Sequence, residues 1–348
     1  DDPRVTRNIL IGLDDTKGAE TGQKVVVHVT AWKSGLYNPE GRITEVLGYP
    51  DDPDLEILSL IRSYDLPLDF PDPVLEETSG IPEGIPDKLL ADRLDLRDTR
   101  CFTIDPPQAR DFDDAVSIEY LGDGRYRLGV HIADVSAYVP DGSLIDREAL
   151  YRGTSVYLVD RVIPMLPHRL TNEICSLNPD EDRLTMSVIM EIDETGVIDG
   201  YMIHESIIRS ARRLTYQEAQ DWIESGDPAD PDTGAIVADL RHLHRLSRHL
   251  LNERLSRGSL DFDLPDPFVL LDENGLPIDV GKEDRLDSNR LIEECMLAAN
   301  RTVARYLLSK DIPAVYRIHE RPKGDRLQDL LVMLNGYGYQ LSQADVSQ

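Results

Sequence analysis

Residues 103–115 read Thr-Ile-Asp-Pro-Pro-Gln-Ala-Arg-Asp-Phe-Asp-Asp-Ala, and this stretch carries four carboxylates. Apolar residues typical of strands flank it on both sides. Like charges repel, and burial raises that repulsion, so folding alone gives no reason to crowd aspartates between core strands. A hard divalent cation reverses the balance, because Mg²⁺ is held by carboxylate oxygens and retains waters and phosphates. The stretch therefore predicts a site for one or two Mg²⁺ ions, formed by Asp105, Asp111, Asp113 and Asp114.

Two other structures would also gather aspartates. A D-x-D-D run is most often a solvated turn or a helix cap, but the apolar neighbours Phe102, Phe112 and Val116 argue against a free surface loop. A calcium loop of the EF-hand type needs a central Gly and a terminal Glu, and the stretch has neither. Pro106 and Pro107 stiffen the loop, which lowers the entropy cost of holding the carboxylates around one centre.

The composition is that of an acidic globular protein. The chain has 348 residues, of which 37 are Lys or Arg and 65 are Asp or Glu, so its net charge is −28. This length suggests about two or three domains, and 41% hydrophobic residues exclude wholesale disorder. Strong acidity normally argues against a polyanionic partner. It does not exclude one here, because an enzyme that holds divalent cations needs clustered carboxylates.

Several classes of protein are disfavoured by what the sequence lacks. No apolar run is long enough to span a bilayer and no signal peptide is visible at the start, so we expect no membrane partner. The three cysteines are scattered without CxxC spacing, which argues against disulfides and zinc and favours the reducing cytoplasm. No Gly-x-x-x-x-Gly-Lys loop occurs, so we expect no nucleoside triphosphate as a partner.

Composition divides the chain into three regions. Residues 1–50 show short strands separated by Gly and Asn-Pro turns, which favours part of a small barrel such as the OB-fold; an edge meander of the main domain is the alternative. Residues 51–98 begin with a short helix over 55–63 and continue as a Pro-rich tract, expected to be an extended linker wrapped along a surface. Residues 99–348 start with strands and continue with two amphipathic helices. The expected fold class is α+β.

The aspartate stretch resembles the signature of the ribonuclease II / ribonuclease R family, in which a D-x₅-D-x-D-D loop binds the catalytic metal. The similarity covers essentially the whole chain and is closer to the ribonuclease R branch. It implies a partial, cold-shock-like OB-fold followed by an incomplete catalytic domain of the RNB type. Further matching motifs occur in the family's order: His131-Ile132-Ala133-Asp134-Val135-Ser136, Ser155-Val156-Tyr157-Leu158, Ile163-Pro164-Met165-Leu166-Pro167 and Cys175-Ser176-Leu177.

This resemblance implies a Mg²⁺-dependent hydrolytic 3′-to-5′ exoribonuclease, with Mn²⁺ able to substitute. Such an enzyme degrades single-stranded RNA processively to nucleoside 5′-monophosphates, in RNA decay or processing. The four aspartates are then both the metal ligands and the catalytic residues. On chemistry alone, metal ions held there would polarise a phosphodiester and lower the pKa of an attacking water.

The resemblance also assigns four side chains to the RNA. Tyr157 and Phe262 match aromatic residues that stack on bases near the 3′ end, where stacking is worth roughly 1–3 kcal/mol per base. Tyr216 and Glu293 match positions that contact ribose, and both can hydrogen-bond the 2′-OH that separates RNA from DNA. Each has an ordinary alternative, such as a core aromatic residue or a charge on a solvated helix face.

The chain departs from the family pattern at its C-terminal end. Members of the family carry a Thr-Ser-Pro-x-Arg-x-Tyr segment, which supplies an arginine to the scissile phosphate, and a C-terminal S1 module; neither occurs before Gln348. We therefore expect a piece truncated at both ends, whose partners include a complementary C-terminal catalytic segment and an S1 domain. Two alternatives stay open: a catalytically inactive RNA-binding or assembly module that keeps the fold, and hydrolysis of DNA by the same carboxylates.

Overall fold

The computed structural model describes residues 7–32, 37–52, 54–225, 231–262, 266–272, 275–318, 320 and 322–339. Two compact units divide the chain, residues 1–300 and 301–348, and each is described by itself. The second unit contains α7 (Gly324–Gly336). Within the described ranges, none of the helices combines the length and the apolar character needed to cross a membrane.

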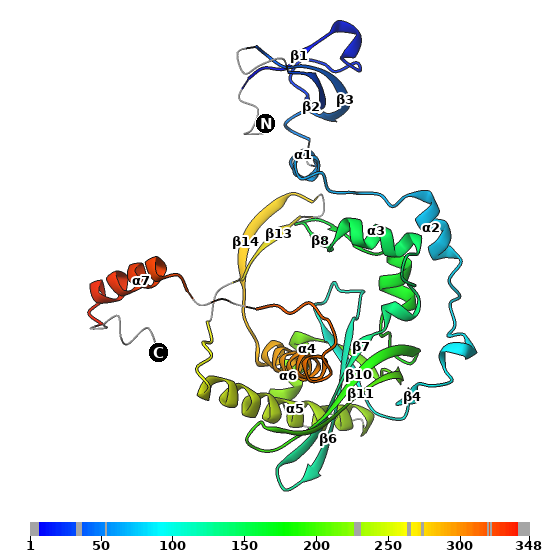
Figure 1. Ribbon diagram of the computed structural model, residues 1–348, viewed down its shortest axis with the longest axis vertical. Coiled ribbons are helices and arrows are strands. Elements are labelled where there is room, and N and C mark those ends of the chain that lie inside the picture. The colour runs from blue at the N-terminus through cyan, green and yellow to red at the C-terminus, as the bar shows by residue number, and fades with distance from the viewer. Residues whose placement is uncertain are drawn as a thin grey trace. The chain divides into compact units, whose positions relative to one another are not determined.

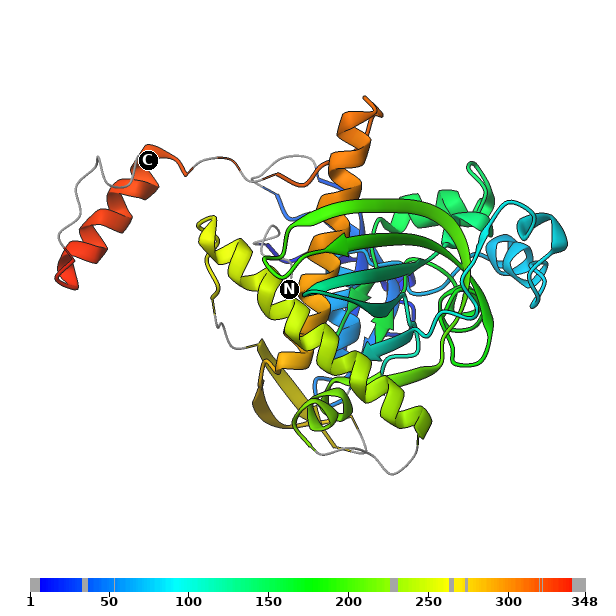
Figure 2. The same ribbon diagram turned by 90° about the horizontal axis from the view of Figure 1, so that it is seen from below.

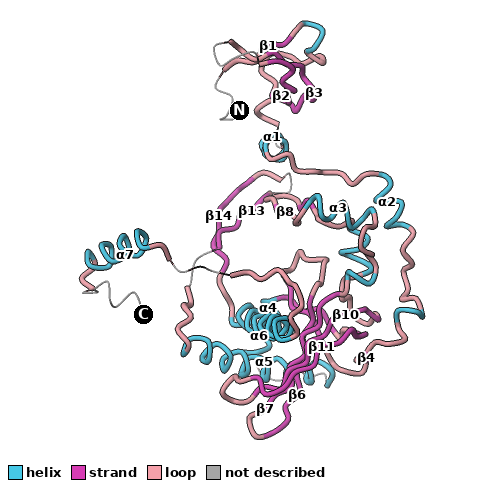
Figure 3. The backbone as a smooth tube through the Cα atoms, viewed as in Figure 1, coloured by secondary structure: helices cyan, strands magenta, loops and turns pink. Residues whose placement is uncertain are grey.

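The N-terminal β module is a three-stranded sheet. Its strands are β1 (Leu10–Ile11), β2 (Lys24–Ala31) and β3 (Glu40–Gly48), in the order β1-β3-β2. A short 3₁₀ turn, η1 (Leu13–Asp15), comes after β1. The β2–β3 pair is antiparallel and shifts register three times, and such bulges bend and twist a strand pair. The strands expected in this region are confirmed (Figure 3).

The segment after this module contains more helix than its prolines suggest. Helix α1 (Leu55–Ser63) was expected, but α2 (Asp72–Ser79) lies where an extended chain was expected, so that expectation was wrong there. Pro73 sits in the first turn of α2, where a missing N–H breaks no helical hydrogen bond. The rest of the tract does lie along the mixed domain, because Arg152 donates to Pro67 O at 2.8 Å and to Asp69 O at 2.7 Å. The segment ends in η2 (Asp87–Leu89) and β4 (Leu94–Asp95).

The mixed domain is built on a seven-stranded sheet, in the order β12-β5-β6-β7-β10-β11-β4. Figure 1 labels five of these strands, β4, β6, β7, β10 and β11. The middle strands pair antiparallel, whereas the edge strands β12 and β4 run parallel to their neighbours. The register places Val116, Val130 and Val188 opposite one another, and all three are buried. Besides β4, the strands are β5 (Phe102–Asp105), β6 (Asp114–Gly122), β7 (Arg125–Ala133), β10 (Asp182–Ile192), β11 (Ile198–Arg209) and β12 (Arg212–Thr215).

An apolar cluster lies between the sheet and the helices and short turns beside it. Ala115 and Ala133 contribute to it from the strands, Ile145 from α3 (Leu144–Arg152), and Leu170 from the π-helical turn η4 (Arg169–Ile174). Between these turns, η3 (Val135–Ala137) comes after β7, and β8 (Val156–Tyr157) pairs with β9 (Val162–Ile163). This packing fixes the loops at the ends of β5, β6 and β7.

Two long helices carry the apolar stripes expected from the sequence. Helices α5 (Pro231–Ser256) and α6 (Asp287–Ser309) lie beside the sheet in both ribbon views (Figures 1 and 2). Leu240, Leu243 and Leu246 of α5 are fully buried, as their helical spacing indicated. Helix α4 (Tyr216–Glu224) and the hairpin of β13 (Asp266–Leu271) with β14 (Pro277–Glu283) complete the described elements. The α+β fold class is thus confirmed.

Candidate active site

Four aspartates lie on the loop that connects two core strands. Asp105 is the last residue of β5, Asp114 is the first of β6, and these strands pair antiparallel through Phe102 and Val116. The side chain of Asp105 is buried, and its Oδ2 has no hydrogen-bond partner among the residues that the structure describes. A buried carboxylate oxygen without a partner is costly, and a cation bound to this atom would remove that cost.

The electrostatics of the four carboxylates reflect their proximity. Burial raises the pKa of Asp105 to about 6, and the charges of Asp114 and Asp111 add to that rise. Burial also raises the pKa of Asp113 to about 6, and the charges of Asp111 and Asp114 add to that rise. Burial raises the pKa of Asp114 as well. These carboxylates therefore disfavour one another's charge until a cation neutralises them.

A cavity of about 260 Å³ opens beside two of the aspartates. Asp111 and Asp113 line it together with Tyr157, Ser155 and Thr171. The Tyr157 side chain is 70% exposed, and partial burial together with the charges of Asp111 and Asp113 raises the pKa of its phenol. An exposed ring close to the carboxylates fits the expected role in base stacking better than a core role, although the stacking itself stays a prediction.

The backbone of the aspartate loop is held from a distant segment. The Ser176 hydroxyl donates to Arg110 O at 2.9 Å and accepts from Phe112 N–H at 3.0 Å. It therefore binds the backbone on both sides of Asp111. Leu177 N–H donates to Phe112 O at 2.9 Å. Ser176 is fully buried, so these bonds are shielded from water. The Cys175-Ser176-Leu177 motif thus has a structural explanation: it positions Asp111.

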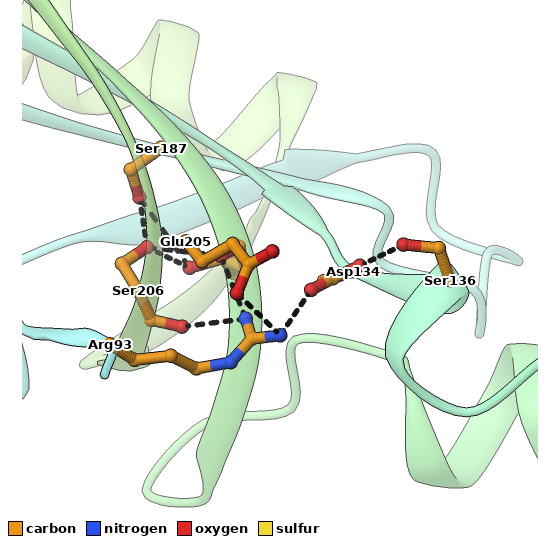
Figure 4. A network of polar contacts seen from close by, with 7 residues as sticks. Arg93, Asp134, Ser136, Ser187, Glu205 and Ser206 are labelled. Atoms are coloured by element: carbon orange, nitrogen blue, oxygen red, sulfur yellow. Dashed lines mark hydrogen bonds and ion pairs between the residues drawn. The ribbon is translucent and has the colours of Figure 1, made fainter. Parts of the chain in front are cut away.

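A buried ion pair supports the end of β7 (Figure 4). Arg93 donates to Asp134 at 2.5 Å, and the Ser136 hydroxyl donates to the other Asp134 oxygen at 2.6 Å. The side chains of Arg93 and Asp134 are only 6% and 5% exposed. One residue before Asp134, the Ala133 N–H donates to Asp113 O at 2.9 Å. The ion pair therefore stabilises the backbone on which Asp113 rests.

His131, inside the same motif, is structural. Its ring lies within hydrogen-bond distance of the Ser117 and Ser187 hydroxyls, at 2.9 and 2.6 Å. Burial lowers the pKa of this imidazole to about 4, so it is neutral at pH 7. Because both ring nitrogens lie within hydrogen-bond distance of hydroxyls, neither is available to a metal ion or to a substrate proton.

A second cavity, of about 480 Å³, brings together the two residues expected to contact ribose. Tyr216 and Glu293 both line it, with Asn289 from the same turn of α6 as Glu293. Tyr216 directly follows Thr215, which pairs with Asp105 in the parallel β12–β5 ladder. The cavity therefore begins beside the aspartate loop, at the first residue of α4.

Helix α6 is fixed beside both features. The Ser288 hydroxyl donates to Tyr216 O at 2.8 Å, which joins the start of α6 to the start of α4. Burial raises the pKa of the Cys295 thiol, and the charge of Asp114 adds to that rise, so α6 also lies near the carboxylates. Glu294 is buried and paired with Arg254 at 2.6 Å, which leaves its neighbour Glu293 facing the cavity.

Phe262 is tied to this region through its neighbour. Asp261 accepts from Arg285 at 2.8 Å and pairs with Arg290 at 2.9 Å, and Arg285 also pairs with Glu293. The Phe262 ring is 65% exposed, so it is not a core residue. The contact of this ring with RNA stays a prediction.

The aspartates fit a hard divalent cation in their chemistry, although no ready-made cage is present. Across the described ranges, no three His, Cys, Asp or Glu side chains stand together as a group that could hold a metal ion. The unpartnered Asp105 Oδ2 and an all-oxygen donor set are what Mg²⁺ or Mn²⁺ requires.

Comparison with known proteins places the chain in a family. The model of the RNB domain matches residues 93–347, and the model of the cold shock domain matches residues 1–71. The chain belongs to the RNB domain family. A curated relative, Ribonuclease R of Aquifex aeolicus (strain VF5), is 42% identical over 98% of this chain. The match covers 48% of that relative, so the chain spans about half of its length.

Solved structures agree with this assignment of the RNB domain. Mycoplasma genitalium RNase R in complex with ribose methylated single-stranded RNA matches all of this chain and 54% of its own, with a TM-score of 0.93 and 26% identity. Yeast Ssd1, described as a pseudonuclease, matches 93% of this chain and 40% of its own, with a TM-score of 0.71 and 22% identity. The second likeness shows the fold alone, so the RNB fold does not by itself establish catalysis.

Proposed function

We propose that this RNB domain belongs to a hydrolytic 3′-to-5′ exoribonuclease that acts on single-stranded RNA. The proposal is that it requires Mg²⁺, or Mn²⁺ in its place, and releases nucleoside 5′-monophosphates processively. One observation carries it: four carboxylates share the β5–β6 loop, and one buried oxygen of Asp105 lacks a partner in the described structure. The likeness to proteins named Ribonuclease R supports the substrate and the reaction.

Asp105, Asp111, Asp113 and Asp114 would hold the cation. When bound there, it would polarise the scissile phosphodiester and lower the pKa of the attacking water. Asp105 and Asp114 stand at the facing ends of β5 and β6, whereas Asp111 and Asp113 open onto the 260 Å³ cavity. The carboxylates must be ionised to bind, so the raised pKa values of Asp105 and Asp113 make binding dependent on pH.

The RNA would be held by rings and by ribose contacts. Tyr157, exposed next to Asp111 and Asp113, is placed to stack on a base while the phosphate meets the carboxylates. Phe262 would stack on a neighbouring base. Tyr216 and Glu293 share the 480 Å³ cavity and would accept from or donate to a 2′-OH, which selects RNA over DNA.

The proposed activity belongs to a polypeptide longer than this chain. Because the chain spans about half of its curated relatives, we propose that a C-terminal catalytic segment and an S1 domain act with it. We also propose a cytoplasmic location, because Cys101, Cys175 and Cys295 are free buried thiols, which suits a reducing compartment. The division into regions 1–50, 51–98 and 99–348 is retained as a proposal.

Replacing Asp113 by Asn tests the function in the full-length protein. Release of 5′-nucleotides from single-stranded RNA should fall by several orders of magnitude, while RNA binding remains. Asp123→Asn is the matched control: the same atoms change at an exposed turn of the β6–β7 hairpin, where a left-handed backbone tolerates Asn. Unchanged release by the Asp113 variant would contradict the assignment.

A module that binds RNA without chemistry is the second candidate. It is favoured by the absence, among the described residues, of three His, Cys, Asp or Glu side chains grouped to hold a metal ion. Full-length protein that binds single-stranded RNA with Mg²⁺ but releases no nucleotide would establish this alternative. A deoxyribose substrate separates the nuclease proposal from hydrolysis of DNA, because loss of the 2′-OH should weaken the contacts of Tyr216 and Glu293.

A further inference from the structure

One arginine outside the expected site touches the aspartate loop at two places. Arg213 Nη2 donates to Pro106 O at 2.7 Å and to Pro107 O at 3.1 Å. Its guanidinium carbon also lies 5.5 Å from the centre of the Phe112 ring, within the range of a cation–π contact. A single side chain therefore spans the loop from the residues after Asp105 to the residue before Asp113.

The base of this side chain is rigidly fixed. Arg213 lies opposite Thr103 in the parallel β12–β5 ladder, so strand pairing fixes the position of its backbone relative to the aspartate loop. Two residues later, Thr215 caps α4 through a reciprocal pair of bonds with Glu218, at 3.1 and 2.8 Å. Tyr216 comes directly after the cap. Arg213 thus connects a rigid strand-to-helix junction with the aspartate loop.

We infer that Arg213 is a positioning residue that holds the aspartate loop in the shape required to bind the catalytic cation. The inference rests on the proposed function and adds to it a residue that belongs to neither the carboxylates nor the RNA contacts. Ser176 fixes the loop on either side of Asp111, and Arg213 fixes its proline end and Phe112. Together they leave the carboxylates little freedom to move apart.

The chemistry of arginine explains why this residue type is needed. One nitrogen, Nη2, donates to both carbonyl oxygens while the planar guanidinium lies near the Phe112 ring, and the lysine ammonium has no planar group to stack there. Nε of Arg213 is buried and finds no hydrogen-bond partner in the described parts of the chain. An unsatisfied buried donor weakens the fold, which is understandable if the side chain serves the site rather than stability.

Charge and position predict opposite effects of removing this arginine. If Arg213 acted only as a positive charge near Asp105, its removal would strengthen the binding of a cation. If it positions the loop, its removal lets the carboxylates separate, and binding weakens. The sign of the change therefore distinguishes the two roles.

The test compares Arg213→Met, Arg213→Lys and the control Arg212→Met in the full-length protein. Arg212 is the adjacent residue of the same strand, but its guanidinium lies 4.9 Å from the Trp222 ring and 3.4 Å from the Thr233 hydroxyl, away from the loop. Mn²⁺ affinity is measured by electron paramagnetic resonance. Amide exchange of residues 108–112 is measured separately without metal.

Arg213→Met should weaken Mn²⁺ binding about tenfold and speed exchange in residues 108–112, as loss of a charge-assisted hydrogen bond predicts. Arg213→Lys, which keeps the charge, should also weaken binding, and Arg212→Met should change neither property. Equal or tighter Mn²⁺ binding by Arg213→Met, with unchanged exchange, would overturn the inference. If the parent protein binds no Mn²⁺, the proposed function fails and exchange alone decides whether Arg213 holds the loop. If Arg213→Met does not fold, Arg213→Lys serves as the same test.

Discussion

Asp105 shows most clearly how a single residue can oppose folding. It is buried, one of its oxygens lacks a partner in the described structure, and its pKa is raised to about 6. At neutral pH the fold must accommodate a buried charge that Thr103 and Arg213 offset only in part. Residues that weaken a fold in this way are often retained for function, because many substitutions at such a position would make the protein more stable.

Asp105→Asn should therefore stabilise the metal-free protein and abolish cation binding. Removing the buried charge should raise the free energy of unfolding by about 1–2 kcal/mol at pH 7.5, less than the full pKa shift would give because the amide is also buried. Urea unfolding in the presence of a chelator measures the change. A variant that is less stable than the parent protein would show that the carboxylate is already compensated within the chain.

The raised pKa values also predict how stability depends on pH. Carboxyls that are protonated more readily in the folded state than in the unfolded state stabilise the fold most below about pH 4. That contribution is lost as pH rises through about 6, the pKa of Asp105 and Asp113. Between pH 4 and pH 6, metal-free parent protein should lose stability relative to an Asp105→Asn/Asp113→Asn variant. Parallel curves for the two proteins in chemical denaturation would contradict this.

For single residues, the sequence predicts which aspartates would bind the cation, but not which side chains hold the aspartate loop in place. The aspartates are recognisable because they lie within one stretch, and their exposure and charge follow from local chemistry. Ser176 and Arg213 contact the same loop from 66 and 107 residues away along the chain. Neither the separation along the chain nor the residue type predicts these contacts, because they depend on how the strands pair.

The end of strand β7 depends on the Arg93–Asp134 ion pair. Because both side chains are almost fully buried at 2.5 Å, removing one partner leaves a charge without compensation. Asp134→Asn should lower the free energy of unfolding by about 3 kcal/mol. The remaining Glu205, 3.6 Å from Arg93 but largely exposed, replaces the lost partner only in part. Urea unfolding at constant pH measures the loss.

A double variant provides the control for this ion pair. Arg93→Met combined with Asp134→Leu removes both charges, and well-packed apolar pairs often replace buried ion pairs at little cost. The double variant should thus be more stable than Asp134→Asn. If Asp134→Asn costs less than about 1 kcal/mol, the pair contributes no more than a surface ion pair and does not support β7.

Elements with a strong period were predictable, and short ones were not. The leucine stripe of α5 repeats over several turns, so its helix follows from spacing alone. Strand β12 has only four residues, two of them arginines, and it forms because β5 offers an open edge. Helix α2 lies where proline density predicts an extended chain, because Pro73 occupies a position in the first turn where proline is favourable.

The net charge of −28 governs how the whole molecule responds to salt. Any cation screens the repulsion among 65 acidic residues, so stabilisation by Mg²⁺ alone does not reveal a site. A specific site adds about 2.7 kcal/mol at a cation concentration of about 100 times Kd. Mg²⁺ should therefore raise Tm more than NaCl of equal ionic strength, and Asp105→Asn should remove only that excess. Equal shifts with both salts would indicate screening alone.

The central claim is that the carboxylates of the β5–β6 loop bind a divalent cation. Crystals of the protein grown with Mn²⁺ test it most directly, because anomalous scattering locates manganese without reference to the protein atoms. We predict a manganese peak in contact with carboxylate oxygens of Asp105 and Asp114, and its loss in Asp105→Asn. An empty loop at saturating Mn²⁺, with the four side chains turned apart, would contradict the metal site and the nuclease mechanism built on it.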